Sequence, residues 1–373
     1  MTLTPLQRYQ QDLQLSDFQE DSSQYLAVRK LEDLHHRLTA RQAPAVRSPL
    51  GWLWQGLAGR LNTTGEPEQG LYFWGGVGRG KTYLMDIFFD SLPFEKKMRV
   101  HFHRFMRRVH RELTALKYQK NPLQLVAKRL AEETTIICFD EFYVSDITDA
   151  MILAALFQGL FERKVCLVAT SNIEPNDLYK DGLQRARFLP AIDSINRYTE
   201  VVNVDGGTDY RLRTLDQVNL YHSPLDEKAE TSLKGTFERL VPDVCTIEEH
   251  VYLEIEGRSI FSRFHAEDVV WFDFSVLCDG PRSQNDYIEI ALEYHSVLLS
   301  NVLEMTEQHE SQARRFVNMV DEFYDRSVKL IISAARPIDK LYSGKRLVFE
   351  FQRTISRLLE MQSREYLSRP HKP

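Results

Sequence analysis

Gly75-Gly76-Val77-Gly78-Arg79-Gly80-Lys81-Thr82 is the stretch of the sequence that decides the fold. It matches the phosphate-loop pattern G-x-x-x-x-G-K-[ST] at every fixed position. The apolar run 70–74 before it is typical of a short buried strand, and the apolar segment 83–89 after it is suited to open a helix. The glycines therefore lie at a predicted strand-to-helix turn, the setting in which this pattern binds a nucleoside triphosphate.

The residues of this stretch suit different parts of a triphosphate and its metal ion. Glycines let backbone N–H groups converge on phosphate oxygens, because no Cβ stands in the way. Lys81 is expected to reach the β- and γ-phosphates, and the Thr82 hydroxyl is a hard oxygen ligand suited to Mg²⁺. We therefore expect all eight residues to bind the nucleotide, with Thr82 also binding the metal.

Polar residues end two later apolar runs. The run 135–139 leads into Asp140 and Glu141, as expected of a buried parallel strand that delivers carboxylates to its C-terminal edge. A helix is predicted at about 149–162, and the next strand, 165–172, ends in polar residues, the last of which is Asn172. Two strands around one helix predict a parallel unit with a right-handed crossover. An exposed acidic loop is the alternative for the acids, and a plain helix N-cap for Asn172.

Composition narrows the class of protein. A chain of 373 residues exceeds the roughly 250 to 300 at which one core stops growing, so we expect a main domain with a subdomain. No run approaches the ~20 apolar residues that cross a bilayer, and the start of the chain lacks a signal-peptide pattern, so we expect a cytoplasmic location. The net charge of -6 makes nucleic acid an unlikely partner, and the four dispersed cysteines argue against zinc clusters and disulfides.

Changes of pattern along the chain predict four parts. Residues 1–60 form an N-terminal helical segment, and residues 61–205 form the nucleotide-binding core. Residues 206–282 form a β-rich insertion that includes a hairpin around Glu256-Gly257-Arg258. Residues 283–373 hold a second strand-helix-strand unit and a C-terminal helical lid, whose last segment starts as a strand near residue 347.

The second strand-helix-strand unit is predicted from an internal echo. Residues 296–342 resemble residues 133–179 at a constant offset, and this predicts a strand rather than a helix at 297–301. In that alignment Asp140 faces Leu303, so the second copy lacks the metal-binding acid. Chance similarity between like architectures is the alternative.

The segment 96–120 is the most basic part of the chain. A surface for an acidic partner or for nucleic acid is one interpretation, and a solvated helix face is the one we favour. His101 and His103 lie in this segment without the spacing of a metal site, so we interpret them as structural.

Several stretches outside the phosphate loop are more specific than the loop itself. They are Phe139-Asp140-Glu141-Phe142, Asp149-Ala150-Met151-Ile152-Leu153, Gly182-Leu183-Gln184-Arg185 with Phe188-Leu189-Pro190, Asp321-Glu322-Phe323-Tyr324-Asp325, and Ser356-Arg357-Leu358 with Glu360-Met361. With these the chain resembles, over nearly its whole length, the ZapE family of AAA+ ATPases, bacterial cell-division proteins with mitochondrial relatives. The expected fold class is then α/β: a P-loop AAA+ core with a parallel sheet, the β-rich insertion and the C-terminal lid.

The resemblance also implies roles in a Mg²⁺-dependent ATPase. Asp140 would bind Mg²⁺, Glu141 would polarise the attacking water, and Asn172 would sense the γ-phosphate and help to hold the water. These roles agree with what phosphoryl transfer needs, which is positioning and charge neutralisation more than covalent chemistry.

Arginines and an N-terminal contact follow from the same resemblance. Arg185 corresponds to the arginine finger that completes a neighbouring subunit's site, with Arg187 as the competing choice and a structural salt bridge as the alternative for both. A second sensor is expected at Arg353 or at Arg357, where a solvated helix face is the alternative. The region around Asp21 and Gln24 would lie near the adenine.

An arginine supplied in trans implies head-to-tail packing, so the resemblance predicts a homo-oligomer, a hexamer in ATP. It also implies that the enzyme acts in cell division, is recruited to the division site and destabilises polymers of FtsZ, a tubulin-like protein. The competing class is a nucleotide-gated binding module, akin to helicase loaders, that holds nucleic acid or a protein client. The acidic net charge favours a protein partner.

Overall fold

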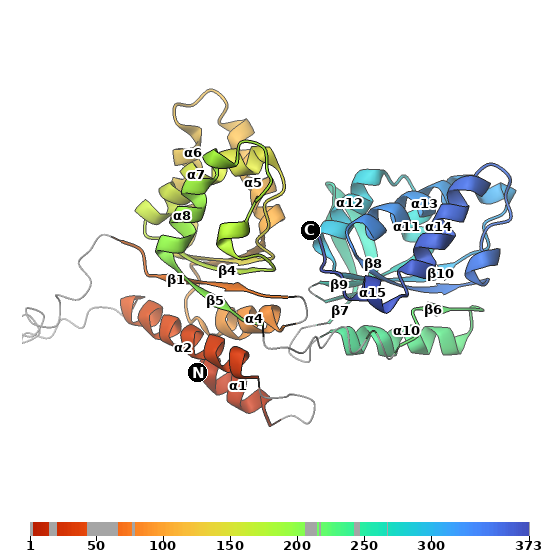
Figure 1. Ribbon diagram of the computed structural model, residues 1–373, viewed down its shortest axis with the longest axis horizontal. Coiled ribbons are helices and arrows are strands. Elements are labelled where there is room, and N and C mark those ends of the chain that lie inside the picture. The colour runs from red at the N-terminus through yellow and green to blue at the C-terminus, as the bar shows by residue number, and fades with distance from the viewer. Residues whose placement is uncertain are drawn as a thin grey trace, which may run out of the picture. The chain divides into compact units, whose positions relative to one another are not determined.

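The computed structural model describes residues 3–14, 21–42, 66–76, 79–205, 215, 218–241, 247–266 and 268–372. The chain forms two compact units, Met1–Thr208 and Asp209–Pro373, each built on its own sheet (Figure 1). Among the described residues, no helix is long and apolar enough to cross a membrane.

The first unit is built on a five-stranded sheet in the order β2-β3-β4-β1-β5, and every pairing in it is parallel. Its strands are β1 (Gly70–Trp74), β2 (Lys97–His101), β3 (Ile136–Asp140), β4 (Cys166–Ser171) and β5 (Thr199–Asn203). All residues of β3 and β4 are buried, because helices cover both faces of the sheet. The parallel sheet confirms the predicted α/β class and the predicted unit of two strands around one helix.

Helices pack on the two faces of this sheet as Figure 1 shows. One face carries α1 (Pro5–Asp12), α2 (Ser22–Gln42) and α4 (Lys81–Ser91), and the other carries α5 (Phe102–Ala115), α6 (Pro122–Glu133), α7 (Ile147–Glu162) and α8 (Leu189–Tyr198). Two short 3-10 turns, η1 (Pro175–Asp177) and η2 (Arg185–Arg187), precede α8. The N-terminal helices are fixed to α4 by packing and by the Tyr83 hydroxyl, which donates to Asp12 at 2.8 Å.

The second unit has a six-stranded mixed sheet in the order β6-β11-β10-β9-β8-β7. Its strands are β6 (Tyr221–His222), β7 (Glu248–Ile255), β8 (Arg258–Ala266), β9 (Val269–Asp273), β10 (Ser296–Val302) and β11 (Lys329–Ala334). Its helices are α10 (Glu227–Leu240), α11 (Phe274–Cys278), α12 (Gln284–Glu293), α13 (Glu310–Asp325), α14 (Val348–Glu360) and α15 (Arg364–Leu367), with 3-10 turns η3 (Glu307–His309) and η4 (Ile338–Lys340). The predicted hairpin is confirmed as the antiparallel pair β7 and β8.

The four-part division of the chain stays a prediction, but the sheet of the second unit joins strands on both sides of residue 283. β9 lies in the segment predicted as an insertion, and it pairs in parallel with β10, which lies beyond that boundary. The same segment contains the 14-residue helix α10, which its strand patterns did not indicate.

The expected strand near residue 347 is wrong, because α14 begins at Val348. Leu347, Phe351, Thr354 and Leu358 are buried at intervals of three and four residues, whereas Phe349 is 81% exposed. This is the spacing of one face of a helix. The consecutive apolar residues at the start of the segment made it look like a strand.

The internal echo is confirmed as a strand-helix-strand unit formed by β10, α13 and β11, with β10 and β11 parallel. The likeness extends further, because the parallel order β6-β11-β10-β9 repeats the order β1-β4-β3-β2 of the first unit. Two units of one chain therefore share a four-stranded arrangement.

The offset between the copies is not constant, so the facing of Asp140 with Leu303 is wrong. Glu141 and Asn301 both have positive φ, 51° and 62°, and both backbone amides donate at 3.2 Å to a hydroxyl of the next strand, that of Thr170 or Ser333. The offset is 160 residues at this turn but 163 at the helix starts, Ile147 and Glu310. In the structural register Asp140 corresponds to Ser300, so the second copy still lacks the acid.

Candidate nucleotide site

The predicted site residues leave the carboxyl ends of three neighbouring strands. The phosphate loop follows β1, Asn172 follows β4, Asp140 ends β3 and Glu141 follows it, with β4 between β1 and β3. Parallel strands bring their carboxyl ends to the same edge of a sheet, which is where open α/β sheets bind ligands. Val77 and Gly78 of the loop lie outside the described residues.

Lys81 links the phosphate loop to Asn172. It is the first residue of α4, and its ammonium donates to the carbonyl oxygens of Gly75 and Gly76, each at 2.7 Å, and to Oδ1 of Asn172 at 2.8 Å. Two residues that lie 91 positions apart in the sequence are thus in direct contact. A phosphate oxygen that bound this ammonium would lie within reach of the Asn172 amide, as a γ-phosphate sensor requires.

Gly80 requires glycine for two reasons. Its φ of 74° lies in the left-handed region, and a Cβ added there would be 2.6 Å from Nε2 of Gln24. That amide, 4% exposed, donates at 3.2 Å to the carbonyl oxygen of Arg79. Gln24 therefore packs against the phosphate loop.

The sequence patterns did not indicate this loop contact of Gln24. Asp21 lies just before α2, where its carboxylate accepts from the amides of Ser23 and Gln24 at 2.7 and 3.3 Å. This places Asp21 as an N-terminal cap of α2. Proximity of the two residues to an adenine stays a prediction.

Asp140 is 6% exposed and forms an ion pair that the sequence did not reveal. Nε of Arg99, on β2, donates to its Oδ2 at 2.7 Å and Nη2 donates to its Oδ1 at 3.4 Å, while Nη1 binds Asp86 on α4. Burial raises the pKa of the Asp86 carboxyl, and the nearby Asp140 adds to this, while Arg99 acts in the opposite direction.

Glu141 occupies a constrained turn directly after β3. Its φ of 51° is unusual for a residue other than glycine, and it is maintained by hydrogen bonds to the neighbouring strand β4. The amides of Glu141 and Phe142 donate to Oγ1 and to the carbonyl oxygen of Thr170, at 3.2 and 2.7 Å. The same turn occurs at Asn301 in the second unit, so it belongs to the strand-to-helix connection that the two units share.

The donor groups at this edge fit Mg²⁺ better than zinc. Mg²⁺ is usually bound by one or two oxygen ligands of the protein together with phosphates and water, and Asp140 and Thr82 supply a carboxylate and a hydroxyl. Across the part of the chain that the structure describes, no group of three or more His, Cys, Asp or Glu side chains could hold a metal ion. His101 and His103, with ring centroids 6.0 Å apart, are therefore not part of such a group.

The two candidate arginine fingers differ in their surroundings. Nη2 of Arg185 donates at 2.6 Å to the carbonyl oxygen of Asn176, and the side chain is partly buried. Arg187 is exposed, and within the described residues its side chain has no hydrogen-bond or ion-pair partner. Neither side chain contacts Lys81, Asp140 or Asn172, so both stay candidates for action on another subunit.

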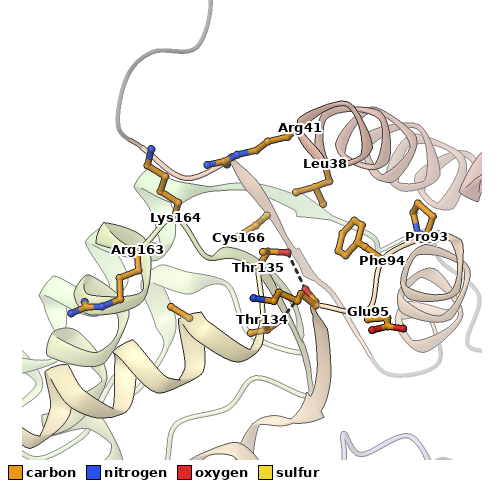
Figure 2. A pocket seen from close by; sticks show the side chains of 12 residues that line it. Leu38, Arg41, Pro93, Phe94, Glu95, Thr134, Thr135, Arg163, Lys164 and Cys166 are labelled. Atoms are coloured by element: carbon orange, nitrogen blue, oxygen red, sulfur yellow. Dashed lines mark hydrogen bonds between the residues drawn. The ribbon is translucent and has the colours of Figure 1, made fainter. Parts of the chain in front are cut away.

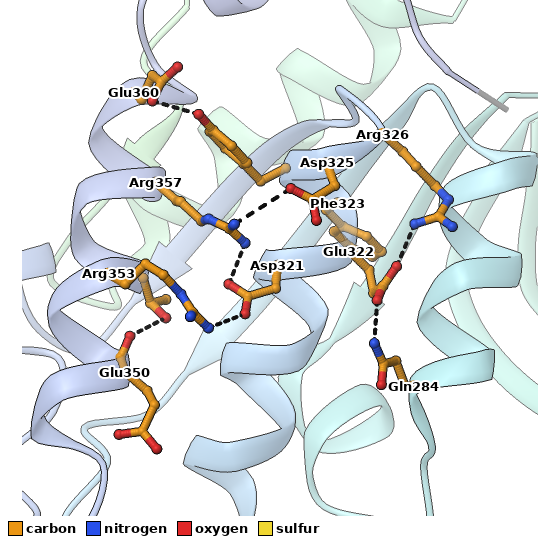
Figure 3. Close-up of polar contacts among 12 residues, drawn as sticks. Gln284, Asp321, Glu322, Phe323, Asp325, Arg326, Glu350, Arg353, Arg357 and Glu360 are labelled. Atoms are coloured by element: carbon orange, nitrogen blue, oxygen red, sulfur yellow. Dashed lines mark hydrogen bonds and ion pairs between the residues drawn. The ribbon is translucent and has the colours of Figure 1, made fainter.

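The two candidate second sensors form ion pairs within the second unit. Figure 3 shows Arg353 and Arg357 extending from α14 to the same carboxylate, Asp321 of α13. Arg357 also lies 3.5 Å from Asp325 and stacks over the ring of Tyr324. These contacts join α13 to α14, a structural role, and a sensor role for either arginine stays a prediction.

A pocket of about 650 Å³ lies at the opposite edge of the first sheet (Figure 2). It is lined where β2, β3 and β4 begin, by Lys96, Thr134, Thr135, Lys164 and Cys166 among others. Burial raises the pKa of Cys166 to about 12, so its thiol is protonated at neutral pH. The pocket contains no residue that the sequence predicts for the nucleotide site.

The predicted basic surface of the first unit is partly neutralised by acids of the same unit. Arg108 on α5 binds Glu112 and Glu133, at 2.9 and 2.7 Å. This pairing agrees with the solvated helix face that we favoured for the segment.

The second unit lacks the chemistry of the first despite its matching strand order. Between β6 and α10, where a phosphate loop would lie, the sequence is Ser223-Pro224-Leu225-Asp226, without glycine. The Asp226 carboxylate accepts from the amide of Ala229 at 2.8 Å and so occupies the N-terminus of α10. A negative side chain at that position repels phosphate.

We expect one nucleotide bound per chain, because only the first sheet has a phosphate loop. Equilibrium dialysis with a slowly hydrolysed ATP analogue should saturate at one equivalent in the wild type and show no saturable binding in Lys81→Ala. Lys340→Ala, in the second unit, is the matched control and should keep one equivalent. Saturation at two equivalents, or saturable binding that survives in Lys81→Ala, would contradict this expectation.

The chain is similar to a known protein family and to several curated proteins. The family model described as AFG1-like ATPase matches residues 3–370. The cell division protein ZapE of Escherichia coli K12 is 48% identical over 375 residues, which cover 99% of each chain. Lactation elevated protein 1 homolog B of Danio rerio is 37% identical over 80% of this chain and 68% of its own.

Solved structures similar to part of the chain include DnaI and the DnaC helicase loader. DnaI is 18% identical over 52% of this chain and 88% of its own, with a TM-score of 0.35. The DnaC helicase loader is 14% identical over 52% of this chain and 98% of its own, with a TM-score of 0.34.

Proposed function

The chain belongs to the AFG1-like ATPase family, and we propose that it hydrolyses ATP with Mg²⁺ in order to act on a protein partner in cell division. The observation that carries the hydrolysis mechanism is the contact between Lys81 and Asn172 at the edge where Asp140 ends β3 and Glu141 follows it. ATP hydrolysis needs side chains that bind the triphosphate, the metal ion and the attacking water close to one another. The proposed groups for all three leave this edge of the sheet.

Each side chain has a distinct task in this mechanism. The loop amides and Lys81 bind the β- and γ-phosphates. Asn172 contacts the Lys81 ammonium, and from this position it orients the γ-phosphate. Glu141 accepts a proton from the attacking water, and the hydrogen bonds of its turn hold its backbone directly after the strand end. Asp140 and Thr82 would hold Mg²⁺, which neutralises charge on the phosphate oxygens when it is bound.

We propose FtsZ polymers as the partner and their destabilisation as the outcome. The support is the full-length similarity to a cell division protein, together with the net charge of -6, which disfavours nucleic acid. The proposal includes a cytoplasmic enzyme that is recruited to the division site and forms a homo-oligomer, a hexamer in ATP, in which Arg185 completes the neighbouring site.

The rate of ATP hydrolysis in the presence of FtsZ polymers tests whether FtsZ is the partner. This rate should rise several-fold with FtsZ polymers and stay unchanged with single-stranded DNA. Light scattering of the polymers should fall only when ATP is hydrolysed. Glu141→Gln in ATP is the control, because it should bind the polymers without dispersing them. A rate of ATP hydrolysis that rises with single-stranded DNA and does not respond to FtsZ would instead favour a module akin to a helicase loader. A pull-down with Glu141→Gln that retains no FtsZ would leave the ATPase activity supported and FtsZ unsupported as the partner.

A further inference from the structure

Arg99 occupies a position between two acids that belong to different parts of the nucleotide core. It lies on β2, Asp86 lies on the helix that follows the phosphate loop, and Asp140 ends β3. The three side chains are 18%, 13% and 9% exposed, so water screens their charges only partly. All three guanidinium nitrogens take part, since Nε and Nη2 donate to Asp140 and Nη1 donates to Asp86.

This arrangement restrains Asp140 more than a single ion pair does. A planar guanidinium that contacts both oxygens of a carboxylate fixes the plane of that carboxylate as well as its position. The guanidinium is itself held by Asp86, five residues after Lys81 on α4. The orientation of Asp140 is therefore tied to the helix that carries Lys81 and Thr82.

Arg99 contacts the carboxylate that the proposed function assigns to Mg²⁺, and it does so from a largely buried position. Residues that orient metal ligands in this way tune metal affinity, and their loss typically weakens it by about 10- to 100-fold.

We propose that Arg99, anchored by Asp86, is a positioning residue that holds Asp140 in the orientation that binds the Mg²⁺ of the bound nucleotide. The proposal deepens the Mg²⁺-dependent hydrolysis proposed above and rests on it. Arg99 does not touch the nucleotide in this scheme, and it acts through Asp140.

The test measures metal dependence apart from hydrolysis. A fluorescent, slowly hydrolysed ATP analogue is titrated into full-length protein at a series of Mg²⁺ concentrations and also in chelator, and Mn²⁺ binding is followed by electron paramagnetic resonance. Arg99→Gln should raise the Mg²⁺ concentration for half-maximal binding by about 10-fold or more, while the affinity in chelator stays close to that of the wild type. The Mg²⁺ concentration for half-maximal binding of Arg99→Lys should lie between those of the wild type and Arg99→Gln, because lysine keeps the charge and loses the planar guanidinium.

Arg108→Gln is the matched control, because Arg108 also binds two acids of the first unit, Glu112 and Glu133. It should keep the Mg²⁺ dependence of the wild type even if its melting temperature falls. Asp86→Asn, which loosens Arg99 without removing it, should shift the Mg²⁺ dependence in the same direction as Arg99→Gln and by less. This variant and Arg99→Lys carry the test if Arg99→Gln does not fold.

Two outcomes overturn the proposal and can be told apart. If the Arg99 and Asp86 variants melt earlier but need no more Mg²⁺ than the wild type, the cluster is only structural. If the wild type binds the analogue equally well with and without Mg²⁺ and the nucleotide complex binds no Mn²⁺, the metal requirement of the proposed function fails, and the role of Arg99 fails with it.

Discussion

Glu141→Gln should lower steady-state ATP turnover by about 100-fold or more while ATP binding is retained, because an amide cannot accept the proton of the attacking water. The two side chains have nearly the same size, so the turn after β3 should survive the change. The backbone amides of Glu141 and Phe142 hold that turn by donating to Thr170, and the change leaves both amides in place. Phosphate release measures turnover, and a fluorescent nucleotide measures binding.

Glu162→Gln is the control for removing one carboxylate from the same unit. Glu162 ends α7, immediately before the turn into the amino end of β4, and it accepts a hydrogen bond from Gln158 at 2.9 Å. Its turnover should stay within about twofold of the wild type, since changes at surface positions away from the chemistry have small effects. Turnover of Glu141→Gln within a few-fold of the wild type would exclude Glu141 as the group that activates water.

The parts of the site that the sequence predicted are those encoded locally. The phosphate loop is a continuous pattern, and Asp140, Glu141 and Asn172 each come directly after an apolar strand. In a parallel sheet these strand ends meet at one edge, so their proximity follows once the strands are identified. The contact of Lys81 with Asn172 fulfils that expectation.

The contacts that the sequence did not reveal depend on register between distant segments. Arg99 reaches Asp140 because β2 and β3 pair in parallel with Arg99 opposite Cys138, and no local pattern states that register. Gln24 lies 55 positions before Arg79 in the sequence, and it reaches the phosphate loop because α2 packs on α4. Both side chains are largely buried, with Gln24 4% and Arg99 18% exposed, and an unpaired polar group is costly there. Partners were therefore to be expected, although the sequence did not identify them.

The sequence predicted only part of the similarity between the two units, because their register also depends on segments that differ in length. The echo held where helix and strand lengths match, and it failed at Asp140 because the segment from Asn301 to Glu310 is longer than that from Glu141 to Ile147. Loops tolerate such insertions at little cost, so an alignment by constant offset fails first at a strand end. Side chains at strand ends carry the chemistry, and a small slip there changes which residue occupies the metal position.

Arg185→Ala should lower ATP turnover by about 1,000-fold with ATP binding retained, because an arginine finger stabilises charge that develops only during phosphoryl transfer. The local structure supports a presented arginine. Gln184 before it has a φ of 57°, and one guanidinium nitrogen is held by the Asn176 carbonyl oxygen, which restricts the side chain before any partner arrives. Arg187→Ala is the matched control, two positions away and exposed, and should lose no more than a few-fold.

Mixing two inactive variants separates action on a neighbour from a structural role. A Glu141→Gln subunit has an inactive site but an intact Arg185, and an Arg185→Ala subunit has the reverse. In a mixed head-to-tail oligomer the first completes the site of the second, so turnover of the mixture should rise well above the sum of the separate rates.

The same mixture shows where the assignment would fail. A mixture as inactive as its parts means that Arg185 acts within its own chain, through the hydrogen bond that joins η2 to η1. If turnover is instead lost in Arg187→Ala and restored when that variant is mixed with Glu141→Gln, the exposed arginine is the finger and Arg185 only positions the turn that presents it.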